Sequence, residues 1–447
     1  MGKKWVIIPV EVKQREFLGR MLLACVAANS GYSVLLGHDR VIRRLAAYLP
    51  KGIIFDKSLG MARDRKVLRY HRLGYKLTAL DEESTGFYVE PDLILPLRLS
   101  HEALERAEYW FCLSETIREH AARLFPNHAD KFVTTGMPRT DVWRPEVNGI
   151  FGDETARIRA EHGKYILFCS NFAHVIHARS GAFLDQQYRR LAKSNSEISD
   201  FRLSTEQEGR DNLDKFVAVF PKIRTWFPHV KLIVRPHPSE DHEYWHSLAA
   251  KTGHFEVQTN GAASPWILGA ECLLHHGCTT GVEAEIMGKP HIMYAPCPDK
   301  HHDTEMMKTF APIVHTQDKL RAKLSSIMDG DYNQKDRNDL ESYFASLTGE
   351  LSSRKIVSSF HSIDVAPQKL RRWLKLMRFT PRHLIAQYWP RSRKAGSYSR
   401  QKWSETSAGD VAQIAARFQS LLGLENTLTT EEVFPQLFRI EKLETQE

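Results

Sequence analysis

Short apolar runs alternate with amphipathic helical patterns over most of this chain. Residues 5–10 (WVIIPV) are apolar throughout, a pattern with a helical period follows from about Glu16 to Ser30, and a second apolar run covers Ser33–Leu36. A strand, a helix and a second strand at this spacing form the βαβ unit of a parallel sheet. Because the alternation continues as far as the run KFVTTG, we predict one doubly wound α/β domain over residues 1–150.

The same alternation starts again after residues 144–163, where Pro, Gly and charged residues without a period indicate a linker. The runs from KYILFCSNF to HIMYA predict a second doubly wound α/β domain over residues 160–350. Within it, the polar stretch 173–212 lacks a clear period, so we expect a long loop or an irregular helix there.

The composition is that of a well-packed protein: of the 447 residues, 42% are hydrophobic and 26% are charged. No apolar run reaches the roughly 18 residues that a membrane-spanning helix requires, and the first apolar run is too short for a signal peptide. The six cysteines form no CxxC pair, which argues against disulfides and against zinc held by cysteine. We therefore expect a cytoplasmic protein.

The formal net charge of +8 changes this picture once it is located. Residues 365–404 hold eleven Lys and Arg and no Asp or Glu, so the rest of the chain would carry −3. This segment lies in residues 354–447, where the βα alternation stops and we predict a helical, basic extension. Hydrophobic side chains interleave the cations of residues 368–394, as in an amphipathic helix on an anionic membrane. Its predicted membrane contacts are Arg371, Arg372, Trp373 and Lys375. Nucleic-acid binding and a plain surface helix with solvated cations are the alternatives.

The most informative motif lies where the apolar run ECLLHH meets a predicted helix. His276 and Gly277 precede Thr279 and Thr280, which open that helix. The free N–H groups and the dipole of a helix N-terminus favour an anion, and a glycine lets the backbone approach it closely. Glu283, about one turn further, is placed to accept hydrogen bonds from ribose hydroxyls. The alternative is a threonine helix cap beside a core histidine.

A second motif follows the run KLIVRP. Arg235 and His237 stand at the C-terminal end of this predicted strand, and Pro238 helps to keep the backbone extended. Residues two apart in an extended chain point to the same side, so this cation and this imidazole can face one phosphate. A surface turn is the alternative. Two strand ends that favour anions within one domain predict a nucleotide phosphate site.

The third motif is a run of carboxylates, Asp81, Glu82 and Glu83, after the predicted strand KLTAL. Crowded carboxylates repel each other, which raises the pKa of at least one of them towards the range of a general base. A solvated turn is the alternative.

Three polar residues after the first strand of the second domain are candidates for lining a ligand cleft: Ser170, Asn171 and His174. A loop with structural polar caps explains them equally well. We predict no metal site, because the histidines form no HExxH motif or comparable metal-binding set.

With these residues in view, the chain resembles bacterial surface-carbohydrate (polysaccharide) biosynthesis proteins of the GT-B type. It is similar to capsular Kdo transferases and GT-B sialyltransferases and, more remotely, to CDP-glycerol glycerophosphotransferases, over about residues 1–350. In the sialyltransferase-like enzymes an acidic pair followed by Gly supplies the catalytic base; Glu82-Glu83 matches the pair, and Ser84 replaces the Gly. His237-Pro238 resembles their His-Pro motif, which binds the CMP phosphate, and Thr279-Thr280 resembles their paired-hydroxyl phosphate contact. The stretch TTGMPRTD resembles a junction of glycerophosphotransferase-like proteins.

This resemblance implies two Rossmann-like domains that face a cleft, with the acceptor on residues 1–150 and the nucleotide sugar on residues 160–350. It implies a metal-independent glycosyltransferase that moves a CMP-activated acidic sugar (Kdo, sialic acid or a related nonulosonate) to a surface polysaccharide or lipid-linked glycan of a capsule or lipopolysaccharide. The protein would need no cofactor, would bind no nucleic acid, and would work in the cytoplasm or peripherally on the inner membrane. Two alternatives remain: a non-hydrolysing UDP-sugar 2-epimerase, which shares this fold, and a non-catalytic, membrane-docked assembly factor.

Overall fold

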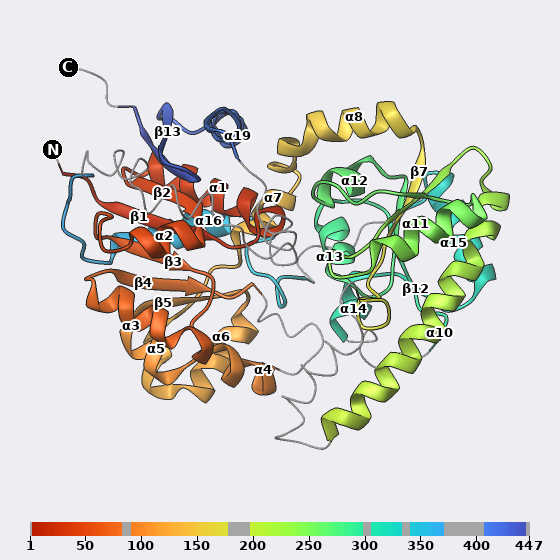
Figure 1. Cartoon of the computed structure of the whole chain (residues 1–447), viewed down its shortest axis with the longest axis horizontal. Coiled ribbons are helices and arrows are strands. Elements are labelled where there is room, and N and C mark those ends of the chain that lie inside the picture. The colour runs from red at the N-terminus through yellow and green to blue at the C-terminus, as the bar shows by residue number, and fades with distance from the viewer. Residues whose placement is uncertain are drawn as a thin grey trace, which may run out of the picture. The chain divides into compact units, whose positions relative to one another are not determined.

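The computed structural model describes residues 2–82, 91–177, 197–297, 305–332, 340–370 and 406–443. It divides into two compact units, one formed by Met1–Ile150 with Leu340–Glu447 and the other by Phe151–Asp339. Each unit is a mainly or wholly parallel β-sheet with helices packed on it (Figure 1). The predicted fold class, α/β with two Rossmann-like units, is confirmed.

The described part of the first unit holds an eight-stranded sheet. In spatial order its strands are β13 (Leu428–Phe434), β14 (Leu437–Lys442), β2 (Ser33–His38), β1 (Trp5–Val10), β3 (Ile53–Asp56), β4 (Lys76–Leu80), β5 (Ala107–Cys112) and β6 (Phe132–Thr134). The strands from β2 to β6 are parallel, and β14 joins β2 antiparallel. Strand β1 is buried along its whole length, as its continuous apolar sequence requires.

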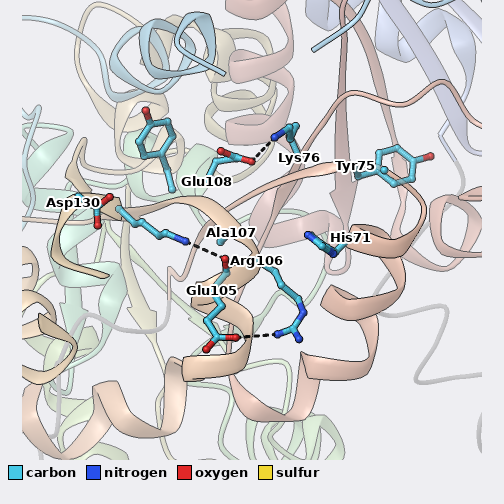
Figure 2. Close-up of a pocket in the computed structure, with 11 residues that line it drawn as sticks. His71, Tyr75, Lys76, Glu105, Arg106, Ala107, Glu108 and Asp130 are labelled. Atoms are coloured by element: carbon cyan, nitrogen blue, oxygen red, sulfur yellow. Dashed lines mark hydrogen bonds and ion pairs between the residues drawn. The ribbon is translucent and has the colours of Figure 1, made fainter. Parts of the chain in front are cut away.

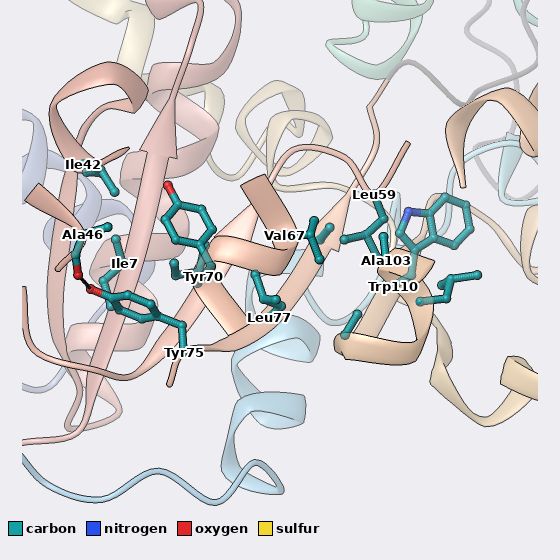
Figure 3. Packing of buried hydrophobic residues seen from close by; sticks show 14 of the residues in the cluster. Ile7, Ile42, Ala46, Leu59, Val67, Tyr70, Tyr75, Leu77, Ala103 and Trp110 are labelled. Atoms are coloured by element: carbon teal, nitrogen blue, oxygen red, sulfur yellow. Dashed lines mark hydrogen bonds between the residues drawn. The ribbon is translucent and has the colours of Figure 1, made fainter. Parts of the chain in front are cut away.

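Helices cover both faces of this sheet, because successive side chains of a strand point to opposite sides. Trp5 and Ile7 of β1 belong to a core cluster under one group of helices, and Val6 and Ile8 are buried outside that cluster. The first group, part of whose core is seen in Figure 3, consists of α2 (Asp39–Leu45), α3 (Asp64–Arg72), α4 (Pro91–Arg98), α5 (His101–Arg106) and α6 (Glu115–Leu124). A second group packs around α1 (Lys13–Asn29) and consists of α7 (Pro138–Trp143), α16 (Ser352–His361) and α19 (Ala408–Leu422). Short 3-10 helices, η1 (Met61–Arg63), η2 (Pro126–Lys131) and η3 (Asn148–Phe151), connect some of these elements.

The C-terminal part of the chain returns to the first unit and completes its sheet. Strands β13 and β14 form an antiparallel hairpin, and Phe438 of β14 pairs with Leu36 of β2. Our prediction that residues 354–447 form a helical extension is therefore wrong, since the described part of this region contains both helices and strands and belongs to the first unit. The hairpin escaped the pattern because most of β13 is only half-buried and alternates weakly.

A buried carboxylate fixes this return. Asp141, at the end of TTGMPRTD, accepts hydrogen bonds from Ser352 N at 2.9 Å, Ser353 N at 2.7 Å and Ser353 Oγ at 2.7 Å. These are donors of the first turn of α16, so Asp141 caps a helix that begins more than 200 residues later. Arg144 adds a hydrogen bond from Nη1 to the Ser346 carbonyl at 2.8 Å.

The second unit holds a six-stranded parallel sheet in its described part. In spatial order its strands are β12 (Ile313–Val314), β11 (His291–Tyr294), β10 (Cys272–His275), β7 (Tyr165–Cys169), β8 (Lys231–Arg235) and β9 (Glu256–Val257). Its helices are α8 (Gly152–His162), α10 (Glu197–Trp226), α11 (His242–Thr252), α12 (Ser264–Gly269), α13 (Thr279–Ile286), α14 (Glu305–Phe310) and α15 (Gln317–Met328). An aromatic core joins β7 to α10 and includes Phe168 stacked on Phe216 at 4.8 Å between ring centroids.

One expectation for this region was wrong and a second was wrong in part, since residues 178–196 of the polar stretch lie outside the described residues. The predicted linker, residues 144–163, contains α8, which shows no period because Ile158 and His162 are its only buried residues. Residues 197–226 form the single long helix α10, so the stretch predicted as a loop or irregular helix ends in regular structure.

Candidate functional site

The strand order of the second unit indicates where a ligand would bind. The chain runs from β7 to β8 and β9 on one side, and then continues with β10 on the other side of β7. A crevice opens at the carboxyl ends of the strands where the order reverses in this way, and ligands of doubly wound sheets bind there. The segments that follow β7 and β10 are Ser170–Asn171 and His276–Thr280, which are among the predicted site residues.

The turn from β10 into α13 has the form expected of an anion site. Gly277 has a φ of 57°, a left-handed conformation that favours glycine. Cys278 occupies the N-cap position, and its sulfur lies 2.7 Å from Thr280 Oγ1. Because a thiol is a weak acceptor, the amide groups of this first turn retain capacity for a stronger one. Thr279 and Thr280 are half-buried, so the helix start is within reach of solvent.

The two histidines of this segment are buried in the core of the unit. The His276 ring stacks on Phe172 at 5.4 Å between centroids, and its Nδ1 lies 3.1 Å from the Tyr294 carbonyl oxygen. His275 Nε2 lies 3.2 Å from His291 Nδ1. The His275 ring also fits against Gly281 of α13, where an added Cβ would lie 2.4 Å from the ring carbon Cε1. These contacts of His276 with Phe172 and Tyr294 help to fix the position of the turn.

Two predicted site residues at the end of β8 differ in their surroundings: Arg235 is buried and His237 is exposed. Arg235 is buried, donates to the carbonyls of Asn260 at 2.9 Å and Gly261 at 2.8 Å, and lies 5.2 Å from the Trp266 ring centroid. The guanidinium thus orders the segment after β9, and phosphate binding by Arg235 stays a prediction. His237 and Pro238 are exposed. His237 Nδ1 accepts from Ser239 N at 3.2 Å, which shapes the turn that presents this imidazole.

Glu240, which follows β8 and was not among the predicted site residues, forms hydrogen bonds to residues that follow β7. It accepts hydrogen bonds from Ser170 Oγ at 2.8 Å, Phe172 N at 2.6 Å and Trp245 Nε1 at 2.8 Å. Burial raises the pKa of Glu240 to about 7, and this effect outweighs the hydrogen bonds to its carboxylate, which lower the pKa. Ser170 is therefore a buried structural contact, and Asn171 is half-buried beside it.

Two further predicted residues lie nearby. Glu283 of α13 is buried and accepts from Ser264 Oγ at the start of α12, so it joins two helices; a ribose contact stays a prediction. His174 is half-buried and packs near Gly209 of α10.

The first unit has its own reversal of strand order, between β1 and β3, and charged residues gather there. Glu11 follows β1 and pairs with Lys57 and Arg63, each at 2.9 Å. These cations lower the pKa of Glu11 to about 2 against the effect of burial. Glu16, in the first turn of α1, is buried and accepts from Glu11 N at 2.8 Å.

A buried guanidinium lies one turn deeper in α1. Arg20 lies 4.3 Å from the Phe55 ring centroid, and its Nε and Nη2 have no hydrogen-bond partner within the described part of the chain. Burial raises the pKa of Glu16, and the nearby charge of Glu82 adds to this, whereas Arg20 and Lys57 oppose it. The structure thus brings a buried carboxyl with a raised pKa, that of Glu16, under the influence of a second carboxyl, that of Glu82.

The three predicted carboxylates after β4 have separate surroundings. Asp81 is buried, accepts from Ser58 Oγ at 3.0 Å and lies 3.6 Å from Arg98 Nη1. Glu82 is half-buried, and Glu83 lies outside the described residues. A separate charge cluster centres on Lys66, which lies between Asp39 at 2.7 Å and Asp56 at 2.8 Å.

A polar cavity of about 530 Å³ lies elsewhere in the first unit (Figure 2). Lys76 and Ala107, which begin β4 and β5, line it, so it opens at the amino ends of the strands. Some of the charges that line it pair with one another, Lys76 with Glu108 at 2.9 Å and Arg106 with Glu105 at 3.7 Å. Because ligands of parallel sheets bind at the opposite edge, we do not assign the site here.

The remaining predictions concern metals and membranes. Within the described residues no cluster of His, Cys, Asp and Glu has the arrangement of a metal site. The six cysteines are free thiols. The search of the described residues also finds no helix with the length and hydropathy needed to span a membrane. The predicted membrane contacts Arg371, Arg372, Trp373 and Lys375 lie outside the described residues.

Comparisons with known proteins find only distant structural similarity. No protein-family model matches the chain, and no curated protein matches it. Among solved structures, UDP-N-acetylglucosamine 2-epimerase from Rickettsia bellii shares 12% identity at a TM-score of 0.46, over 80% of this chain and 96% of that one. The UDP-GlcNAc 2-epimerase from Methanocaldococcus jannaschii shares 11% at 0.48, over 80% and 99%. The wall teichoic acid polymerase TagF shares 12% at 0.45, over 80% and 88%. Since these TM-scores lie below 0.5, we draw no functional argument from them.

Proposed function

We propose that this protein is an enzyme that acts on a nucleotide-activated sugar, with the nucleotide phosphate at the turn from β10 into α13. The observation that carries the proposal is the position of the polar groups. In both units they follow the strands at which the strand order reverses, where doubly wound sheets bind ligands. In the second unit the turn at Gly277 and the start of α13 suit an anion, and in the first unit carboxyl groups suit proton transfer.

The first candidate reaction is the 2-epimerisation of a UDP-N-acetylhexosamine. Removing a proton from a sugar carbon and returning one requires an acid and a base on the same enzyme. Glu16, whose pKa is raised by burial, and Glu82, whose charge acts on Glu16, are our candidates for such a pair. Arg20 lies one turn after Glu16 in α1, and two nitrogens of its guanidinium have no hydrogen-bond partner in the described part of the chain. This guanidinium would stabilise the carboxylate of Glu16 after the proton leaves.

The second candidate is the transfer of a CMP-activated acidic sugar (Kdo, sialic acid or a related nonulosonate) to a polysaccharide or lipid-linked glycan. The observation that favours it is the engagement of Arg235, the cation that the sequence predicted to bind phosphate. Arg235 is engaged with two backbone carbonyls, which leaves the helix start and exposed His237 as anion-binding groups. That set suits the single phosphate of CMP better than a diphosphate. Neither reaction requires a metal or a further cofactor in this proposal.

The two reactions separate in one assay, because epimerisation needs no acceptor. The protein is incubated with UDP-GlcNAc alone, and NMR detects any conversion to UDP-ManNAc. In parallel, CMP release is measured from CMP-ulosonates with and without a glycan acceptor. Conversion without acceptor assigns the epimerase, and acceptor-dependent CMP release assigns the transferase. If the protein catalyses neither reaction and binds no nucleotide, the enzyme proposal is wrong and the assembly-factor alternative takes its place.

A further inference from the structure

The first unit carries a second concentration of positive charge, separate from residues 365–404. Residues 39–76 contain eleven Lys and Arg and three Asp and Glu. Three of these cations, Lys57, Arg63 and Lys66, pair with carboxylates at the edge of the sheet. Six others are arginines of α2 and α3 and are exposed, namely Arg40, Arg43, Arg44, Arg65, Arg69 and Arg72.

Their spacing places these arginines in two stripes. Those of α2 follow the order i, i+3, i+4, and those of α3 follow i, i+4, i+7, so each set lies on one side of its helix. The inner sides of the same helices bury Ile42 and Ala46 of the first and Val67 and Tyr70 of the second in one core cluster (Figure 3). Both stripes therefore project outward from the same face of the sheet. We call this surface the arginine face.

The acidic groups around the arginine face are few. Asp39 is shielded and shared between Lys66 at 2.7 Å and Arg43 at 3.6 Å, and Asp64 is half-buried. The face ends at α5, where exposed Glu102 pairs with Arg106 at 3.5 Å. Like charges three or four residues apart destabilise a helix, so helix stability does not account for the stripes.

We propose that the arginine face docks onto the anionic phospholipids of a membrane surface. Arginine presents a planar fork that binds phosphate bidentately, and cations near an anionic leaflet add to each other's attraction. Exposed Tyr48, at 43%, lies just beyond α2 and suits the interface between lipid headgroups and water.

The path of the chain adds a second, independent argument. Gln368 accepts from Trp5 Nε1 at 2.9 Å through its carbonyl and from Lys51 N at 2.8 Å through its side chain. Leu370 packs against the core cluster beneath the arginine face. The described chain stops there, and the sequence that follows, to residue 404, holds ten Lys and Arg and no acid. The basic segment 365–404 thus begins at the side of the first unit that carries the arginine face.

The test uses the full-length protein and sedimentation with vesicles of phosphatidylcholine, alone or with about 30% phosphatidylglycerol. The face variant replaces four arginines by glutamine: Arg43, Arg44, Arg69 and Arg72. A matched control makes the same change in charge at exposed residues of the second unit: Arg157, Lys164, Lys215 and Lys251. Circular dichroism and thermal unfolding confirm that both variants are folded.

Since one cation near an anionic leaflet contributes about fivefold in affinity, the face variant should bind the anionic vesicles at least about tenfold more weakly. The control should bind as the wild type does, and binding of the wild type should weaken with salt. Equal binding by the face variant and the control overturns the proposal. So does binding of RNA without binding of vesicles, which would make the face a nucleic-acid surface. This proposal does not depend on the proposed function, because the four arginines lie outside the candidate site.

Discussion

Replacing Asp141 by alanine should destabilise the first unit more than any exposed substitution at a helix start. Asp141 is fully buried and accepts three hydrogen bonds from Ser352 and Ser353, which begin α16. Without the carboxylate, two backbone N–H groups and a hydroxyl lose their acceptor where water does not reach. Each buried unsatisfied donor costs about 1–3 kcal/mol, and the loss of a helix cap costs about 1 kcal/mol. We therefore expect a loss of about 3–5 kcal/mol in the free energy of unfolding.

The consequence should reach the interior of the sheet, because α16 also carries Phe360, whose ring centroid lies 6.3 Å from that of Phe55 and 6.2 Å from that of Phe111. Asp141→Asn keeps one acceptor oxygen, so its loss should be smaller, about 1–3 kcal/mol. Asp153→Ala is the matched control, since Asp153 is an exposed aspartate in the first turn of α8.

Urea unfolding followed by tryptophan fluorescence measures these differences, and hydrogen exchange at the start of α16 locates them. The effect should fall on the transition of the first unit if the two units unfold separately. An Asp141→Ala protein that unfolds within about 1 kcal/mol of the Asp153→Ala control would refute the reasoning that a buried cap joins the two parts of this unit.

Three further predictions test the packing and the charges. Gly281→Ala should destabilise the second unit by about 1–3 kcal/mol, because the new Cβ would overlap the His275 ring. Gly409→Ala on α19 should be neutral or stabilising, because its new Cβ would make an ordinary van der Waals contact with Ser407 Oγ at 3.6 Å; thermal unfolding compares the two variants. Burial raises the pKa of Glu240 from 4.5 to about 7 in the folded protein, so the folded protein holds this proton more tightly than the unfolded chain. The contribution of Glu240 to the free energy of unfolding should therefore fall as the pH rises from 4.5 to about 7. Glu240→Gln should flatten the dependence of stability on pH in that window. Lys66→Met should cost about 3–5 kcal/mol, because it removes the cation that Asp39 and buried Asp56 share. Lys66 helps to hold the pKa of Asp56 below its ordinary value, so the loss should shrink in acid as Asp56 protonates; urea unfolding at two pH values measures both effects.

Buried strands could be predicted from the sequence because their signal is local. The predicted strand KLTAL matches β4 residue for residue, and the predicted strand KLIVRP exceeds β8 by one residue, since every interior position of these strands is apolar or small and buried. Helix α8 and strand β13 could not be predicted in this way. Each is mostly exposed or half-buried, so burial leaves no periodic pattern in the sequence.

The partners of the polar residues were the harder part of the site. The sequence placed Arg235 correctly at a strand end, but the carbonyls that it binds lie 25 and 26 residues further along the chain. Glu240 could not be predicted as a site residue, because its partner Ser170 is 70 residues away and no neighbouring residue in the sequence indicates that Glu240 is buried. Glu16 was missed for the same reason, since its environment depends on residues after β3 and β4 as well as its own helix. Local patterns indicate where a strand or helix ends, and tertiary contacts decide which side chains remain available to a ligand.

The central claim is that the start of α13 binds a nucleotide phosphate, and titration calorimetry with CMP and UDP tests it most directly. An aspartate in the first turn of a helix stabilises the helix but repels an anionic ligand, so Thr279→Asp should keep the fold and weaken nucleotide binding at least about tenfold. Gln317→Asp makes the same change of charge in the first turn of α15 and should bind as the wild type does. Nucleotide binding that is equal in all three proteins, or no binding by the wild type, would contradict the claim.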